Sequence, residues 1–209
     1  PLINNINEYS NLSASFSSTA QIQVSSGSGA ILNKGLFLSG SDRTSYLAMT
    51  ETENSPIGTA NYSFSVFFKP VNVARVSVPQ QIFGWGGGSN GFGAFITASK
   101  VITNFYESDK GSVTSASIAN DNWYHLAATY EDGTAKLYLN SELIQTDNVS
   151  FGTVSNWTGD LRIGGSNYSQ EYYLESGSAP SSFSGTTPPY EGYIDELRIY
   201  KDKVLSQNE

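Results

Sequence analysis

Short runs of strand-forming residues recur along the chain at intervals of about ten residues, and this spacing is the strongest constraint on its fold. Each run is rich in aromatic and β-branched residues and is bounded by Gly, Asn, Asp or Pro, which favour turns. The predicted strands are 21–24, 35–39, 45–49, 62–69, 81–85, 91–97, 100–106, 113–118, 122–130, 134–140, 143–146, 160–164 and 193–200. No helix longer than a turn or two competes with them, so we expect an all-β sandwich or barrel.

The run 62–69 alternates between two faces. Its even-numbered residues are Tyr, Phe, Val and Phe, whereas its odd-numbered residues are Ser or Lys, with Phe67 as the exception. Because successive side chains of a strand point to opposite faces, we expect only the even-numbered face to be deeply buried.

A tight hairpin is predicted at Glu131-Asp132-Gly133, between the runs 122–130 and 134–140. Its Asp-Gly pair tolerates the positive φ angles that two-residue hairpin turns need. A second short turn at Asn140-Ser141 returns the chain into a third strand, which makes a meander. The charged segment 201–209 is predicted to form one helical turn that docks Val204 and Leu205.

Composition bounds the class of protein. The chain of 209 residues suits one domain, and its 38% hydrophobic and 14% charged residues exclude a disordered tail or a charge-rich helical protein. The net charge of −8 disfavours partners such as nucleic acid or anionic lipid. The chain has no cysteine, which excludes disulfides, thiolate metal sites and thiol nucleophiles.

No stretch approaches the roughly 20 apolar residues that span a bilayer, and the first residues lack the pattern of a signal peptide. The sequence starts at Pro1, so we expect a segment of a longer protein. The segment 166–191 is rich in Tyr, Ser, Gly and Pro without alternation, and it is longer than a structural connection requires. We interpret it as a loop insertion with a role in function.

Four stretches carry a resemblance to a known family. They are Asn122-Trp123-Tyr124-His125-Leu126-Ala127-Ala128-Thr129-Tyr130, Lys136-Leu137-Tyr138-Leu139-Asn140, Leu161-Arg162-Ile163-Gly164-Gly165 and Gly192-Tyr193-Ile194-Asp195-Glu196-Leu197-Arg198-Ile199-Tyr200. Together they resemble laminin-G-like jelly-roll domains of the concanavalin A-like lectin/glucanase superfamily, from about residue 20 to the end. The resemblance implies a single-domain β-sandwich of two antiparallel sheets over 1–209. It also implies a binding, adhesion, virion or catalytic module, often with Ca²⁺, and so does not decide function.

Catalysis is disfavoured by the residues present. Glucanases of this fold carry Glu-x-Asp-x-x-Glu on one strand, and the nearest match, Glu107-Ser108-Asp109-Lys110-Gly111-Ser112, ends in Ser and is predicted to form a turn. His125 is the only histidine, so a Ser-His-Asp arrangement would need it as the base. We interpret His125 as a packing residue and predict that the protein is not an enzyme.

Asp195 is the candidate metal ligand. It shares an alternating face with Tyr193, Leu197 and Ile199 unless a bulge breaks the phase, and a carboxylate turned toward a core needs a compensating partner. Hydrogen bonds from backbone N–H groups are one answer. The other is a structural Ca²⁺ held by Asp195, carbonyl oxygens and Asp42.

Three places combine aromatic rings with polar side chains, as sugar recognition requires. They are Trp85 with Asn90 beside a run of glycines, Tyr106 at a strand end, and Asn167, Tyr168, Tyr172 and Tyr173 in the long loop. Packing of Trp85 in the core and of the tyrosines over a sheet edge is the competing interpretation. Trp123 and Trp157 are assigned to packing.

The function that these observations favour is non-catalytic recognition of a glycan or another cell-surface component by a module of a larger extracellular or virion protein. One alternative is a structural or assembly domain of a phage fibre, capsid decoration or adhesin stalk, with other subunits as partners. The other is a glycoside hydrolase of the same fold.

Overall fold

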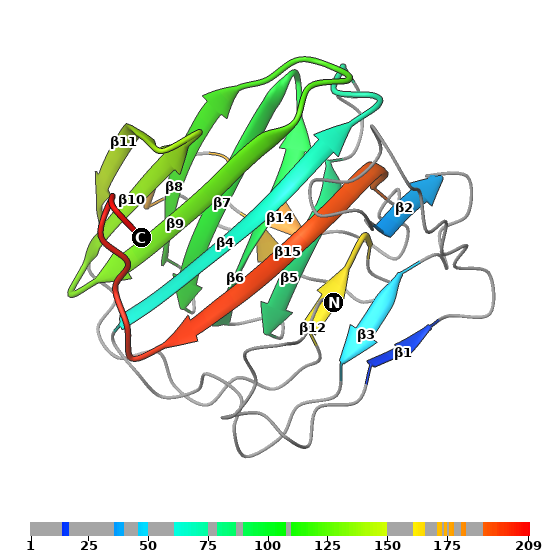
Figure 1. Ribbon diagram of the computed structural model, residues 1–209. Helices are drawn as coiled ribbons and strands as arrows, with labels where there is room; N and C mark the ends of the chain where they lie inside the picture. Colours follow the sequence, from blue (N-terminus) through cyan, green and yellow to red (C-terminus); the bar gives the residue numbers. More distant parts are fainter. Residues whose placement is uncertain are drawn as a thin grey trace.

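In a computed structural model, the chain forms two antiparallel β-sheets packed face to face (Figure 1). The structure describes residues 14–16, 36–39, 46–49, 61–74, 79–86, 90–107, 110–149, 161–165, 171–172, 174, 176–177, 181–182 and 190–209. These residues contain strands and no helix, and hence no helix that could cross a membrane. The predicted all-β, two-sheet jelly-roll sandwich is confirmed.

One sheet has seven strands in the order β1-β3-β12-β5-β6-β7-β8. Their bounds are Ala14–Phe16 (β1), Leu47–Met49 (β3), Leu161–Ile163 (β12), Gln80–Gly86 (β5), Asn90–Thr97 (β6), Lys100–Glu107 (β7) and Lys110–Ser117 (β8). The other sheet has six strands in the order β11-β10-β9-β4-β15-β2. Their bounds are Glu142–Asn148 (β11), Thr134–Leu139 (β10), Tyr124–Glu131 (β9), Asn61–Pro70 (β4), Glu191–Lys201 (β15) and Leu36–Ser39 (β2).

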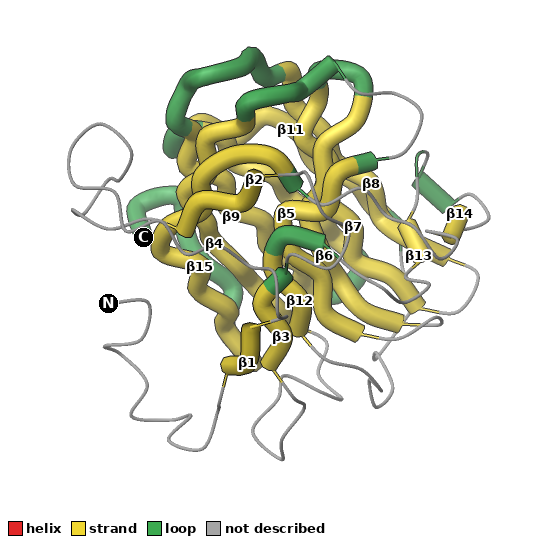
Figure 2. The backbone as a smooth tube through the Cα atoms, turned by 90° about the vertical axis from the view of Figure 1, so that its right-hand side faces the viewer, coloured by secondary structure: helices red, strands yellow, loops and turns green. Residues whose placement is uncertain are grey.

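A short ribbon of β13 (Glu171–Tyr172) and β14 (Ser181–Ser182) lies within the segment predicted as a loop insertion. Figures 1 and 2 place this ribbon on the outer side of the seven-stranded sheet. The predicted strand at 21–24 lies outside the described residues.

The predicted meander is confirmed in its turns as well as its strands. Asp132 and Gly133 have φ angles of 44° and 90°, and Asn140 and Ser141 have φ angles of 52° and 68°. Positive φ at both central residues gives the twist that joins neighbouring antiparallel strands.

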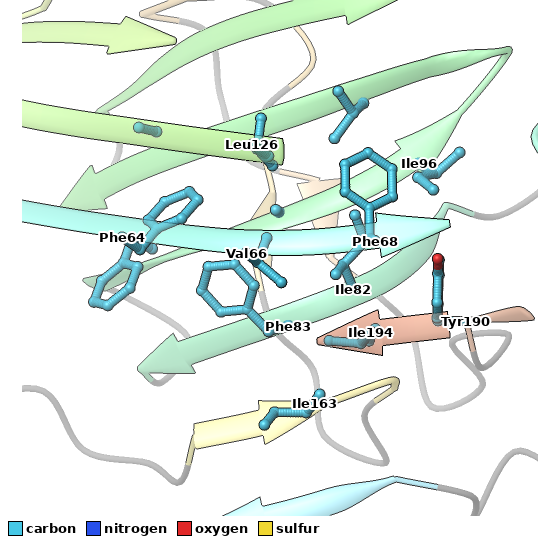
Figure 3. Packing of buried hydrophobic residues seen from close by; sticks show 14 of the residues in the cluster. Phe64, Val66, Phe68, Ile82, Phe83, Ile96, Leu126, Ile163, Tyr190 and Ile194 are labelled. Carbon is cyan, nitrogen blue, oxygen red and sulfur yellow. The ribbon is translucent and has the colours of Figure 1, made fainter. Parts of the chain in front are cut away.

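The core lies between the sheets and is built from inward positions of strands of both sheets (Figure 3). The even-numbered residues of β4 are buried as predicted, and Phe64 packs edge-on against Phe83 of the opposite sheet with ring centroids 4.7 Å apart. Such edge-to-face pairs add specific attraction to the burial of apolar area. The paired rings fix how the two sheets face each other.

The edge of β8 is closed by side chains from β11 rather than by another strand. The backbone N–H of Val113 donates to a carboxylate oxygen of Asp147, and that of Ser115 donates to the side-chain oxygen of Gln145, both at 2.8 Å. Unpaired strand edges attract other chains, so these side chains both join the sheets and protect the edge.

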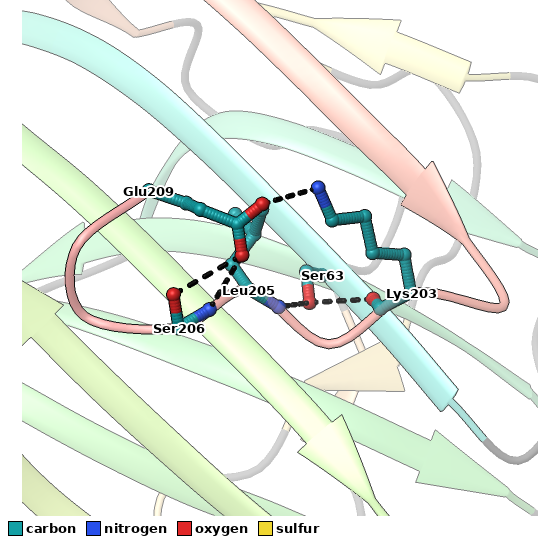
Figure 4. Close-up of polar contacts among 5 residues, drawn as sticks. All are labelled: Ser63, Lys203, Leu205, Ser206 and Glu209. Carbon is teal, nitrogen blue, oxygen red and sulfur yellow. Dashed lines mark hydrogen bonds and ion pairs between the residues drawn. The ribbon is translucent and has the colours of Figure 1, made fainter.

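The last residues form a turn without a helix, so the predicted helical turn at 201–209 is wrong, although Leu205 is buried as expected. The hydroxyl of Ser63, on the outward face of β4, donates to the carbonyl of Lys203 at 2.8 Å and accepts from the N–H of Leu205 at 3.0 Å (Figure 4). This contact holds the segment in an extended course and buries Ser63 on a face predicted to be open.

Candidate functional site

Four side chains from neighbouring strands lie in line across the outer face of the six-stranded sheet, the face turned to the viewer in Figure 1. Tyr193 of β15 is paired with Phe37 of β2 on one side and with Lys69 of β4 on the other. Trp123, immediately before β9, completes the line, and its ring centroid is 6.2 Å from that of Tyr193. We call Phe37, Tyr193, Lys69 and Trp123 the aromatic row.

Strand alternation turns the row outward. Leu36 and Leu38 flank Phe37, Phe68 precedes Lys69, and Ile194 follows Tyr193; all four of these neighbours are buried in the core. The members of the row therefore point away from the core, and each of them is partly exposed. Three interstrand spacings separate β2 from β9, so the row extends for roughly 14 Å.

The backbone of β15 holds Tyr193 rigidly in place. The buried hydroxyl of Tyr190 donates to the carbonyl of Tyr193 at 3.1 Å. Gly192 has a φ of +148°, and a Cβ atom there would lie 2.3 Å from the carbonyl oxygen of Lys69 and 2.7 Å from the Tyr190 hydroxyl. Only glycine lets β15 approach β4 this closely, which brings the Tyr193 ring beside Lys69.

Trp123 is positioned by a short connection that is anchored to the end of β4. The N–H of Asp121 donates to the carbonyl of Pro70, and the side-chain oxygen of Asn120 accepts from the N–H of Val73. The connection is thus tied both to the last residue of β4 and to the segment that follows it, so that the indole is presented at a defined place.

The rings of the row are tilted rather than coplanar. The ring centroids of Phe37 and Tyr193 lie 4.8 Å apart, and their ring planes make an angle of 47°. The ring planes of Trp123 and Tyr193 make an angle of 48°. The ammonium of Lys69 lies 5.8 Å from the centroid of the Tyr193 ring, within reach of a cation–π attraction. Partly exposed rings offer faces for apolar C–H groups, and the ammonium offers hydrogen-bond donors, which is a combination suited to stacking a sugar.

The adjoining positions of the same face carry Asp195, Phe67 and His125. The His125 ring stacks on Phe67 with centroids 4.4 Å apart. Burial lowers the pKa of His125, and the positive charge of Arg198 lowers it further. The packing interpretation of His125 therefore agrees with its surroundings.

Among the residues proposed from sequence, Trp85 and Tyr106 lie on opposite faces of the seven-stranded sheet. Trp85 is 3% exposed and packs in the core against Phe92. Tyr106 is also 3% exposed, but it lies in a small outer cluster with Phe95, Ile102 and Val113. The two side chains cannot contact one ligand, and burial of Trp85 in the core favours the packing interpretation.

The other proposed residues are placed only in part. Asn90 begins β6 opposite Glu107, next to the Gly91–Tyr106 pair, and Tyr172 belongs to β13. Asn167, Tyr168, Tyr173 and Asp42 lie outside the described residues, as does Trp157. The roles of these residues in binding therefore stay predictions.

The outer face of the seven-stranded sheet has a patch without side chains. Gly84 and Gly86 of β5 are paired with Gly93 and Gly91 of β6, and all four glycines are buried. Nearby, the N–H of Gly177 donates to the carbonyl of Gly111 at 2.9 Å, which ties the segment of β13 and β14 to β8. Because these four glycines are buried whereas the members of the aromatic row are partly exposed, this patch is less accessible to a large ligand than the row.

Asp195 occupies the outward phase of β15, not the inward phase of Leu197 and Ile199. The register of β15 on β4 shifts between Asp195 and Arg198, where Glu196 has a φ of 49°. This bulge moves Leu197 and Ile199 to the core side. The Asp195 carboxylate accepts the N–H of Glu196 at 2.9 Å, as the backbone alternative predicted.

No group of three or more potential metal ligands occurs among the described residues, which do not include Asp42. The carboxylate motif of glucanases is not reproduced on one strand either, because Glu107 ends β7 and is paired with Lys110 at the start of β8. Lys110 and Gly111 belong to β8 rather than to the predicted turn, and Ser108 and Asp109 lie outside the described residues.

Sequence reasoning missed the aromatic row. Trp123 was assigned to packing, and Phe37, Lys69 and Tyr193 were not considered. One signal could have found them: Phe37 stands in the outward phase between Leu36 and Leu38, just as Phe67 interrupts the polar face of β4. A large aromatic residue at an outward position indicates either an interface or a binding surface.

The concanavalin A-like lectin/glucanases superfamily is the class that this architecture defines. Its family model matches residues 40–209, and the chain belongs to that superfamily. No curated protein sequence matches the chain.

Solved structures with the same fold include binding domains of botulinum neurotoxins. A type C toxin, described by its interaction with two ganglioside molecules, has a TM-score of 0.68 at 16% identity. The serotype D ligand-binding domain in complex with N-acetylneuraminic acid has a TM-score of 0.67 at 16% identity, and the serotype G binding domain 0.68 at 12%. Alignments cover 94–95% of this chain but 44% of each toxin chain, so the likeness is one of fold over less than half of those molecules.

Proposed function

We propose that the protein is a non-catalytic carbohydrate-binding module and that the aromatic row is its recognition surface. The observation that carries this proposal is the placement of three partly exposed rings and one ammonium in line across four strands. Burial of apolar side chains is the rule for a soluble fold, so a rigidly supported row of outward aromatic residues favours a binding role.

The mechanism is stacking combined with hydrogen bonding. A sugar places its C–H face on the Trp123 and Tyr193 rings and directs its hydroxyl groups to polar atoms at the margins of the row. The strands are fixed before binding, so little ordering cost opposes association. An affinity in the millimolar to micromolar range, worth roughly 4–8 kcal/mol, suits such a shallow surface.

The comparisons support this proposal in general terms. Superfamily members include lectins, and two of the similar toxin domains are described with gangliosides or N-acetylneuraminic acid. Since the matched part is 44% of each toxin chain, these ligands are attributes of the larger molecules. We extend the proposal to an adhesion role within a larger secreted, surface or virion protein.

A glycan array tests the proposal with three proteins. The unaltered chain should bind a subset of glycans, and Trp123→Ala should weaken that binding about tenfold or more by removing the largest stacking face. Tyr138→Ala is the matched control, because Tyr138 is a partly exposed aromatic residue on β10 outside the row. An array without binding, or equal binding by both variants, would overturn the proposal.

A second candidate function is assembly with other protein subunits. Leu143 and Ile144, adjacent on the edge strand β11, are 44% and 43% exposed. Exposed apolar residues on a strand edge favour contact with another chain. Light scattering after size-exclusion chromatography tests this candidate: a stable oligomer that Leu143→Glu dissociates would support it, and a monomer at all concentrations would oppose it.

A further inference from the structure

We infer that the aromatic row selects sugars bearing a carboxylate, with Lys69 as the residue that recognises the charge. This inference rests on the proposed function and adds the chemical class of the ligand. Its basis is the state of the Lys69 ammonium, which lies beside the Tyr193 ring and forms no ion pair with a carboxylate of the described residues.

Two other basic side chains of the described residues are held by carboxylates, and Lys69 is not. The chain has 19 acidic residues against 11 basic ones. Arg198 pairs with Glu196 at 2.6 Å, and Lys203 pairs with Glu209 at 2.5 Å. In the part of the chain that the structure describes, no carboxylate forms an ion pair with Lys69.

The acidic residues nearest in register do not neutralise Lys69. Glu191 and Asp195 lie two positions on either side of Tyr193 along β15, on the same face. Asp195 is turned to the N–H of Glu196 instead. The ammonium thus keeps its hydrogen-bond donors, apart from the attraction to the Tyr193 ring, available for an incoming anion.

The position of the ammonium fits a charged sugar better than a free anion. Lys69 stands between Tyr193 and Trp123 in strand order, in the middle of the row. A pyranose stacked on these rings therefore brings a carboxylate on its ring carbon close to the ammonium. Partial burial of Lys69 weakens solvent screening, so the charge contact contributes more than it would on an open surface.

Two natural sources share this chemistry, namely sialic acids and uronic acids. The probes are 3′-sialyllactose, a glucuronic acid disaccharide and neutral lactose, titrated by isothermal calorimetry or NMR against the unaltered protein. We expect at least one acidic sugar to bind about tenfold more tightly than lactose, and its affinity to fall as salt rises. The acidic probe with the higher affinity identifies the source.

Lys69→Gln should remove the preference by lowering the affinity for the acidic sugar about tenfold more than the affinity for lactose. Lys136→Gln is the matched control, since Lys136 is a partly exposed lysine of β10 on the same sheet face. Equal binding of neutral and acidic sugars, or equal loss in both variants, would overturn this inference and leave the proposed function standing. Failure of every sugar to bind would overturn both.

Discussion

His125 reports on the packing of the outer face at the scale of a single residue. Its ring is stacked on Phe67, and both burial and Arg198 lower its pKa below the ordinary value of 6.5. As the only histidine, it gives an unambiguous NMR titration. We predict a midpoint below 6.5 in the folded protein; a midpoint at or above that value would contradict the described packing.

The same shift makes stability depend on pH. A lowered pKa in the folded state means that the unfolded chain binds more protons below pH 6.5, so His125 destabilises the fold progressively as pH falls from about 6.5 through the lowered value. Urea unfolding of the unaltered protein and of His125→Gln at pH 7 and pH 5 isolates this contribution. The variant should lose less stability on acidification, and an equal loss would argue against the effect.

The sequence alone predicted some of the contacts of His125 and Asp195 but not the face of β15 on which Asp195 lies. The packing role of His125 and the backbone partner of Asp195 followed from strand chemistry. The phase of Asp195 did not, because alternation assumes a regular strand and the bulge at Glu196 is set by pairing with β4. The pairing of β15 with β4 decides which face Asp195 occupies, and these strands are far apart in the sequence.

At the scale of elements, the edge of β8 depends on side chains of β11. We predict that Gln145→Leu combined with Asp147→Leu speeds amide hydrogen exchange at Val113 and Ser115 about tenfold, because each loses its acceptor. Thr146→Leu, at the exposed position between them, is the control. Unchanged exchange at both amides would show that the edge is protected in another way.

Most strands between residues 61 and 148 could be predicted to within a few residues, because their alternation and turn residues are local signals. The Asp132-Gly133 turn is the best example. β1, β13 and β14 have three residues or fewer and carry no periodic pattern. The final segment was wrongly predicted as a helical turn because its course is set by Ser63, which is distant in sequence.

At the scale of the whole molecule, the fold could be predicted from the sequence, but the aromatic row could not. The eight strands from β4 to β11 are divided between the two sheets. The aromatic row joins residues 37, 69, 123 and 193, which only the sheet order brings together. Trp85 looked like a rim residue because glycines follow it, yet the sandwich encloses it. The superfamily supports many functions on one scaffold, so the site rather than the fold has to decide.

The most direct test of the central claim is a map of the sugar-binding face by NMR. Titration of the isotope-labelled protein with whichever acidic probe binds more tightly, 3′-sialyllactose or the glucuronic acid disaccharide, should shift the resonances of Phe37, Lys69, Trp123 and Tyr193 on the six-stranded sheet. Resonances of Asn104 and Tyr106, on the outer face of the other sheet, should stay unchanged. Shifts confined to Asn104 and Tyr106, or no shifts at all, would contradict the account.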